Sequence, residues 1–221
     1  FTSASRTAFN NPDVRFVNIN VASLDSVKQG GISVVSDARE ALEALATAMG
    51  DYTVSAEYRA RTTELAKEWN DTVSSVYATS DDGAALNQNQ VIGLVNTLSD
   101  PRDVVVCAAG SMPGDLHKLW RTRDRKGYHV EYGYSCMGYE IAGGIGVRMA
   151  APDRDVFIMV GDGSYLMMAT ELVTAVQEGV KVIPVLVQNH GFASIGGLSE
   201  SVGSQRFGTA YRYRSPDGRL D

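Results

Sequence analysis

The sequence has few cysteines and no long apolar run, and these two absences exclude several classes of protein. Only Cys107 and Cys136 occur in 221 residues, too few for a disulfide scaffold and not spaced as a metal site, so we expect a reducing, cytoplasmic environment. No stretch reaches the roughly 18–20 apolar residues of a membrane-spanning helix. The first residues, FTSASR, are not an apolar run of signal-peptide type.

Positive charge is also scarce. Lys and Arg number 20 against 26 Asp and Glu, which gives a formal net charge of −6 at pH 7. The densest basic stretch, RTRDRK at residues 121–126, is interrupted by Asp124 and is typical of a solvated loop. This balance argues against nucleic acid or an anionic membrane surface as a partner.

The chain does have enough apolar material for a sizeable core. Hydrophobic residues make up 44% and charged residues 21% of the sequence, as in soluble globular proteins. At roughly 100–200 residues per domain, the length allows one domain and a part of another, or two small domains. The chain does not begin with Met, and we expect it to be a piece of a longer polypeptide.

The first eighty residues contain one α/β segment and one long helix. Residues 14–21 (VRFVNINV) alternate apolar and polar residues as a strand does, and Asp37 can cap a helix that ends near Gly50. Residues 55–78 place apolar side chains at helical spacing, which predicts an amphipathic connector. A turn-rich break, SDDG at residues 80–83, predicts the domain boundary.

After the break, apolar strands alternate with helices. Strands are predicted at residues 104–108, 156–160 and 182–187, and helices at 138–149 and 165–178, the last closed by Gly179. Another helix is predicted to begin at Asn87 or Asn89 and to end before Pro101. Continuous apolar strands alternating with helices predict an α/β fold with a doubly wound parallel sheet covered on both faces. Pro184 argues weakly against the last predicted strand, because proline has no N–H to donate to a neighbouring strand.

Three predicted strand ends carry unusual residues, and ligands of such sheets bind at the carboxyl ends of the strands. Gly163 and Ser164 follow one strand at the start of a helix, where free N–H groups can receive a phosphate. Asp162 precedes them, and the next strand ends at Asn189, followed by Gly191. A carboxylate, an amide oxygen and the Gly191 carbonyl are suitable ligands for Mg²⁺. We therefore predict half of a magnesium–diphosphate site.

The spacing of these residues resembles the signature of thiamine diphosphate enzymes. The pattern begins Gly161-Asp162-Gly163 and reaches Asn189 after 27 residues, enough for one helix and one strand. The resemblance implies thiamine diphosphate and Mg²⁺ as cofactors, with Asp162, Asn189 and the Gly191 carbonyl as metal ligands. The turn Gly110-Ser111 resembles a loop that supplies further diphosphate contacts.

A second segment, SCMGY at residues 135–139, resembles the cofactor-cupping segment of the acetohydroxyacid synthase and pyruvate decarboxylase superfamily. In that superfamily a large apolar side chain wedges between the two rings of the cofactor. By position this residue is Met137. The backbone carbonyl of Ser135 would accept a hydrogen bond from the amino group of the aminopyrimidine ring.

Within that superfamily, the segments GSMPGDLHKLW, YHVEYGYSCMGYE and QNHGFASIGGLSESVGSQRFGT are most similar to the inositol-catabolic hydrolases of trihydroxycyclohexane-1,2-dione. These enzymes open a cyclic diketone by carbon–carbon hydrolysis to 5-deoxyglucuronic acid. The resemblance implies that residues 1–50 are the end of a central domain, that residues 51–80 are a helical linker, and that residues 81–221 form most of the diphosphate-binding domain.

The resemblance also implies a homo-oligomer whose site lies between subunits, with a catalytic glutamate of the pyrimidine-binding domain absent from this chain. The isolated chain is therefore expected to be inactive. His190, and with it His129 and Tyr132, are candidates for proton transfer to the substrate. Ile195 falls where some relatives carry a catalytic carboxylate, which argues against a decarboxylase.

Two other interpretations stay open at this point. A carboligase or decarboxylase acting on 2-oxo acids would share the same cofactor site. A non-catalytic nucleotide-binding or interaction domain would share the fold alone, and replacement of Asp162 would then leave its ligand affinity unchanged.

Overall fold

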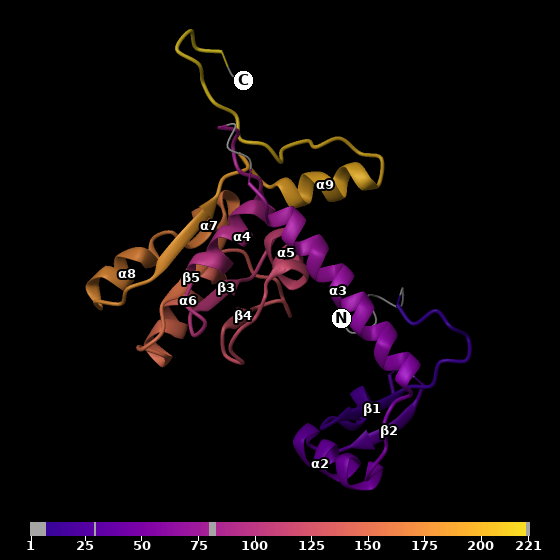
Figure 1. The fold of residues 1–221 in the computed structure, drawn as a ribbon. Helices are drawn as coiled ribbons and strands as arrows, with labels where there is room; N and C mark the ends of the chain where they lie inside the picture. Colours follow the sequence, from indigo (N-terminus) through magenta and orange to yellow (C-terminus); the bar gives the residue numbers. More distant parts are fainter. Residues whose placement is uncertain (1–7, 29, 80–82, 220–221) are drawn as a thin grey trace. The chain divides into compact units, whose positions relative to one another are not determined.

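The computed structural model describes residues 8–28, 30–79 and 83–219. The chain forms two compact units, residues 1–64 and 65–221, which are drawn together in Figure 1. Of the predicted break at 80–83, residues 80–82 lie outside the described part. In the described ranges, no helix is long and apolar enough to cross a membrane.

The first unit is a small parallel α/β segment. Its strands β1 (Val17–Asn20) and β2 (Ile32–Val35) pair in parallel, and α1 (Ser23–Ser26) lies between them in the sequence. Helix α2 (Ala38–Met49) begins where predicted, because the Asp37 side chain accepts a hydrogen bond from the N–H of Arg39 at 2.8 Å. The sequence predicted β1 and α2 but neither α1 nor β2.

The predicted connector is confirmed as a helix, α3 (Ala56–Tyr77). Its carboxyl-terminal half belongs to the second unit, where Val73 is buried in the core. The Tyr77 hydroxyl donates to the Leu119 carbonyl at 2.5 Å, and the Trp69 indole N–H donates to the Lys118 carbonyl at 3.1 Å. These contacts fix the end of the helix against the second unit.

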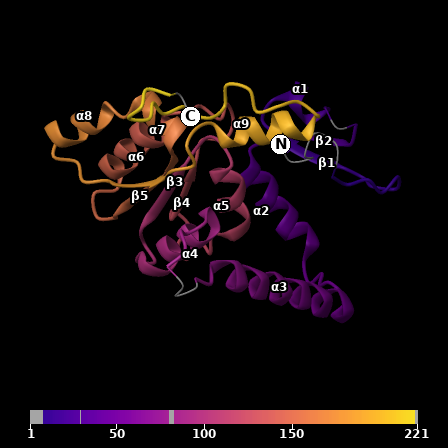
Figure 2. The ribbon, with the colours of Figure 1, turned by 90° about the horizontal axis from the view of Figure 1, so that it is seen from above.

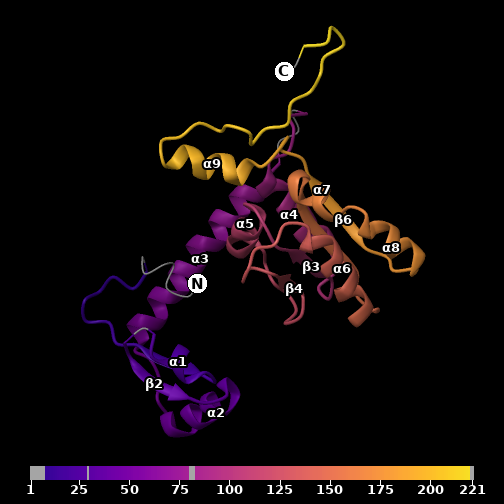
Figure 3. The same ribbon diagram turned by 180° about the vertical axis from the view of Figure 1, so that it is seen from behind.

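The second unit contains a four-stranded parallel sheet in the order β4-β3-β5-β6, which confirms the predicted fold class. Figure 2 shows β3, β4 and β5 between α6 on one side and α4 and α5 on the other, and Figure 3 gives the view from behind. The elements in chain order are α4 (Gln88–Leu98), β3 (Val104–Cys107), α5 (Met112–Leu119), β4 (Tyr128–Val130), α6 (Tyr139–Ala150), β5 (Val156–Gly161), α7 (Asp162–Met168), α8 (Glu171–Gln177), β6 (Ile183–Val187) and α9 (Ala193–Ser201).

Alternation along β3 sends its side chains into two separate hydrophobic clusters, one on each face of the sheet. Val105 and Cys107 pack with Ile92 of α4 and Leu116 of α5. Val104 and Val106 pack on the other face in a cluster completed from α6, α8 and β5 by Ile141, Ile145, Val156, Ile158, Val160 and Ala175. Because both faces are covered, the strand is apolar along its whole length, as the sequence predicted.

Three details differ from the sequence-based expectation. The predicted helix at 165–178 is two helices, α7 and α8, and α7 begins earlier, at Asp162. A helix that the sequence did not predict, α5, forms after β3, and Pro113 is accommodated in its first turn, where a missing N–H costs nothing. Pro184 is accommodated because β6 lies at the edge of the described sheet.

Ion pairs join the segments that lead into the strands, and we call them the amino-end ion pairs. Arg154, before β5, pairs with Asp124, before β4, at 2.7 Å. Lys181, before β6, pairs with Asp155, before β5, at 2.8 Å. This edge of the sheet is opposite to the carboxyl ends of the strands, where ligands bind in such folds.

Candidate functional site

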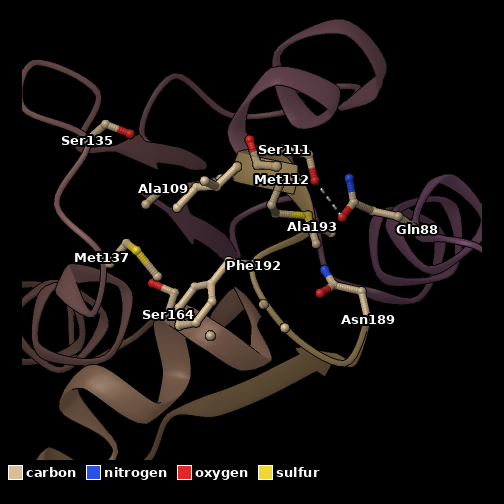
Figure 4. Close-up of a pocket in the computed structure, with 16 residues that line it drawn as sticks. Gln88, Ala109, Ser111, Met112, Ser135, Met137, Ser164, Asn189, Phe192 and Ala193 are labelled. Atoms are coloured by element: carbon tan, nitrogen blue, oxygen red, sulfur yellow. Dashed lines mark hydrogen bonds between the residues drawn. The ribbon is translucent and has the colours of Figure 1, made fainter. Parts of the chain in front are cut away.

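The carboxyl ends of β3, β5 and β6 surround a cavity of about 240 Å³. Figure 4 shows Ser135 and Met137 on one side of it and Gln88 and Asn189 on the other. Of the ten predicted cofactor-binding residues, nine line this cavity: Gly110, Ser111, Ser135, Met137, Gly161, Gly163, Ser164, Asn189 and Gly191. The tenth, Asp162, is buried beside it, at 7% exposure.

The Asp162 carboxylate joins the end of β5 to the loop after β6. Its Oδ2 accepts hydrogen bonds from the N–H of His190 at 2.7 Å and from the N–H of Gly191 at 3.2 Å. Its Oδ1 accepts from the N–H of Gly163 at 2.9 Å. Asp162, at the end of β5, is therefore in direct contact with the backbone that follows β6.

The side-chain amide of Asn189 points at two oxygen atoms. One of its two terminal atoms lies 2.9 Å from the Gly191 carbonyl oxygen and 3.2 Å from Asp162 Oδ1. If this atom is nitrogen, it donates to both oxygens. The hydrogen-bond pattern favours nitrogen at this place, and an amide turned the other way would bring three oxygens together, where a cation could bind.

With the amide oxygen in this place, two of the oxygen–oxygen separations are close to those of a magnesium site. Adjacent ligands of an octahedral Mg²⁺ with bonds of 2.0–2.1 Å are about 2.9 Å apart, close to the separations observed around Asn189. The described residues contain no group of three or more His, Cys, Asp or Glu side chains that could hold a metal. A cation here would instead use one carboxylate, one amide and one backbone carbonyl, as predicted, so these residues fit Mg²⁺.

A backbone segment at residues 209–211 holds the Gly191 carbonyl in place. The N–H of Phe192 donates to the Thr209 carbonyl at 2.7 Å, and the N–H of Tyr211 donates to the His190 carbonyl at 2.8 Å. Gly191 has a φ of +148°, and a Cβ there would collide with the Thr209 carbonyl. Only glycine fits this position.

The hydroxyl of Tyr211 is a further polar group close to this set of oxygens. Its oxygen is buried and has no hydrogen-bond partner in the described part of the chain. Burial raises the pKa of Tyr211, and the nearby Asp162 carboxylate raises it further. A hydrated cation would supply a water molecule for this hydroxyl.

The start of α7 faces the cavity with backbone N–H groups. The first N–H groups of a helix have no partner within it. A Cβ on Gly163 would lie 2.8 Å from the Phe192 ring, so the close approach requires glycine. The Ser164 hydroxyl donates to Glu140 at 2.7 Å and accepts from the N–H of Gly138 at 2.8 Å. The hydroxyl proton is therefore already donated to Glu140, and Ser164 can bind an anion through its backbone N–H.

Glu140 is a site residue that the sequence reasoning missed. The residue is 1% exposed. It accepts hydrogen bonds from the N–H of Ala109 at 3.0 Å, the N–H of Gly138 at 3.1 Å and the Ser164 hydroxyl. One side chain thus joins the end of β3, the start of α6 and the first turn of α7. The available signal was a single acid in the otherwise apolar start of the helix segment YEIAGGIG.

The predicted proton-transfer residues do not contribute to the cavity wall. His190 bonds to Asp162 through its backbone, while its ring Nδ1 lies 3.0 Å from the Tyr213 hydroxyl. His129 Nε2 lies 2.8 Å from the Tyr139 hydroxyl. Neither histidine, nor Tyr132, is among the lining residues. Ile195 does line the cavity, so the wall is apolar at the position where a carboxylate would favour a decarboxylase.

Comparison with known proteins gives one family and a consistent set of relatives. Residues 108–218 match the family described as thiamine pyrophosphate enzyme, C-terminal TPP binding domain. Over 99% of its length, the chain is 38% identical to the 3D-(3,5/4)-trihydroxycyclohexane-1,2-dione hydrolase of Bacillus cereus (strain AH820). It is 42% identical over 100% of its length to the enzyme of that name from Geobacillus thermodenitrificans. The chain spans 38% of the length of these relatives.

Proposed function

This chain belongs to the thiamine pyrophosphate enzymes, and from this premise we propose that it supplies the magnesium–diphosphate half of an active site that hydrolyses a carbon–carbon bond of a cyclic 1,2-diketone. Thiamine diphosphate is the cofactor of this domain family. The observation that carries the proposal is the convergence of the Asn189 amide with the Gly191 carbonyl and the Asp162 carboxylate.

In the proposed site, Asp162, Asn189 and the Gly191 carbonyl hold Mg²⁺. The diphosphate lies against the glycine-rich strand ends and the first turn of α7, where N–H groups and the helix dipole favour an anion. The residues proposed for this contact are Gly110, Ser111, Gly161, Gly163 and Ser164. Ser135 and Met137, on the other side of the cavity (Figure 4), hold the ring portion.

The cofactor supplies an electron sink for cleavage of a bond beside a carbonyl. The residues of this chain orient it and limit access of water to it. The partly enclosed cavity, with apolar lining from Met112, Phe192 and Ile195, favours this role. His190 stays a candidate for proton transfer, and movement of its ring toward the cavity would be required.

The names of the relatives support the proposed substrate. Both are hydrolases of a trihydroxycyclohexane-1,2-dione, so we propose that substrate, with 5-deoxyglucuronic acid as product, for the enzyme containing this chain. We further propose residues 1–50 as the end of a central domain, 51–80 as a linker and 81–221 as the diphosphate-binding domain. A homo-oligomer would supply the pyrimidine-binding half-site.

Calorimetric titration of the chain with thiamine diphosphate tests the metal site. We expect binding that requires MgCl₂, and Asp162→Ala should weaken it about 100-fold or more, because it removes a metal ligand and the anchor of the loop after β6. Asn189→Leu keeps that anchor and should also abolish the dependence on Mg²⁺. Asp71→Ala, at an exposed ion pair on α3, is the matched control. Parent-like affinity in both site variants would rule out the metal site.

A chimera tests the substrate. In it, this chain replaces the matching segment of the Geobacillus thermodenitrificans relative, and turnover is measured with the cyclic diketone and with pyruvate. We expect cofactor-dependent turnover of the diketone and little of pyruvate. Turnover of pyruvate alone would support the carboligase interpretation and contradict the proposed substrate.

A further inference from the structure

The loop between β4 and α6 forms the wall of the cavity that carries Ser135 and Met137. Ser135 has a φ of +54°, in the left-handed region that glycine enters freely and serine rarely adopts. In the described part of the chain, the Ser135 hydroxyl makes one hydrogen bond, a long one of 3.4 Å to the Ala108 carbonyl. A stronger restraint must therefore hold this backbone conformation.

Glu131, the first residue after β4, provides that restraint. Its Oε1 accepts a hydrogen bond from the N–H of Tyr134 at 2.9 Å, and its Oε2 accepts one from the N–H of Cys136 at 2.9 Å. The two donors lie on either side of Ser135 in the sequence. One carboxylate thus fixes the peptide group that follows Ser135, which includes the Ser135 carbonyl, and the peptide group that precedes Tyr134.

The charge of Glu131 fits this role. The N–H groups of Tyr134 and then Cys136 hold the pKa of the Glu131 carboxyl below its usual range, with smaller contributions from the N–H groups of Gly133 and Ser135. The side chain is therefore ionised at neutral pH, and hydrogen bonds to an ionised acceptor are the stronger kind.

We propose that Glu131 is a positioning residue for cofactor binding, which holds Ser135 in its left-handed conformation and thereby sets the Ser135 carbonyl and the Met137 side chain at the cavity wall. The inference rests on the proposed function, because the ligand is thiamine diphosphate. Glu131 itself does not line the cavity and acts through the backbone of the loop.

Four variants test this proposal by calorimetry with thiamine diphosphate and MgCl₂. Glu131→Ala should bind about tenfold more weakly, since Ser135 must then be driven back into an unfavourable region when the cofactor binds. Ser135→Gly keeps the backbone carbonyl and is the reference for the double variant, in which the further change Glu131→Ala should cost less than about threefold in affinity. The double variant should recover most of the lost affinity, because glycine enters the left-handed region freely. Glu178→Ala, at the exposed residue that follows α8, is the matched control.

Rescue by glycine separates positioning from general structural support, because a merely structural loss would not be repaired at residue 135. Parent-like affinity in Glu131→Ala overturns the inference and leaves the proposed function standing. A loss that Ser135→Gly does not repair also overturns it.

A second measurement needs no cofactor. If the parent chain fails to bind thiamine diphosphate, that result counts against the proposed function in this chain, and the second measurement still tests the role of Glu131. Hydrogen exchange at the Tyr134 and Cys136 amides should be about tenfold faster in Glu131→Ala than in the parent. Glu131→Gln, which keeps one acceptor, should be intermediate. Unchanged exchange at both amides in both variants overturns the inference.

Discussion

Glu140 is a carboxyl group in the protein interior, and its three hydrogen-bond donors belong to three different segments. Glu140→Ala should lower the free energy of unfolding by about 3 kcal/mol, because the buried N–H of Ala109 loses its acceptor and a cavity forms. Glu140→Gln should cost less, about 1–2 kcal/mol, because the amide oxygen can still accept from Ala109 and the NH₂ can donate to Ser164. Urea denaturation measures both.

Glu178→Gln, at an exposed position, is the control for Glu140 and should change the free energy of unfolding by less than about 0.5 kcal/mol. If Glu140→Ala were as stable as the parent, the hydrogen bonds of this carboxylate would contribute nothing to the fold. A larger loss in the Gln variant than in the Ala variant would contradict the assigned pairing.

At the residue scale, the sequence could predict groups that act at the ends of strands but not groups that act through backbone N–H donors. Asp162 and Asn189 follow apolar runs, so the topology of a parallel sheet places them at one edge. Glu131 and Glu140 depend on the positive φ angles of Ser135 and Gly138, which no local pattern specifies. The roles of Glu131 and Glu140 follow from the backbone N–H donors around them, which the structure shows.

Among the elements, α4 has a complete amino-terminal cap. The Asn87 side chain accepts from the N–H of Gln90 at 3.0 Å, and the Gln90 side chain accepts from the N–H of Asn87 at 3.0 Å. Asn87→Ala should therefore lower the free energy of unfolding by about 1 kcal/mol. Thermal or urea denaturation measures this loss.

The control for the cap is Asn70→Ala, an exposed position inside α3. Alanine is the better helix former, so this change should be neutral or slightly stabilising. Equal losses in the two variants would mean that the effect at Asn87 does not come from capping.

The elements found from sequence are those with a full apolar run or a clear cap, such as β3, β5 and α4. Strand β4 has only three residues and was missed, because its stability comes from pairing with β3, a long-range contact. Helix α5 was missed because Pro and Gly in its first turn resemble a turn, while Met112, Leu116 and Leu119 bury its inner face. The strand order likewise depends on long-range pairing.

At the scale of the whole molecule, the amino-end ion pairs should make stability depend on pH. The Arg154 guanidinium holds the pKa of Asp124 below its usual range, and the Lys181 ammonium does the same for Asp155. A carboxyl whose pKa is lower in the folded state stabilises the fold fully above its unfolded pKa, near 4. This contribution is lost as the pH falls through the folded pKa.

We therefore expect the melting temperature to fall from pH 5 to pH 2, and to fall less steeply in an Asp124→Asn/Asp155→Asn variant. Asp51→Asn/Asp71→Asn, two exposed positions in the first unit and on α3, is the paired control and should keep the parent slope. An identical slope in the Asp124/Asp155 variant would exclude these pairs as the cause. High salt should also reduce the difference.

The position of the amino-end ion pairs has a consequence for how this domain can change over evolution. They lie at the edge of the sheet opposite to the cavity, and distant sites contribute to stability almost independently. Substitutions in the loops around Asn189 and Ile195 can therefore alter ligand preference without loosening the opposite edge. The amino ends of the strands stabilise the domain against mutation, and the loops at the carboxyl ends can change in sequence and acquire a new ligand specificity.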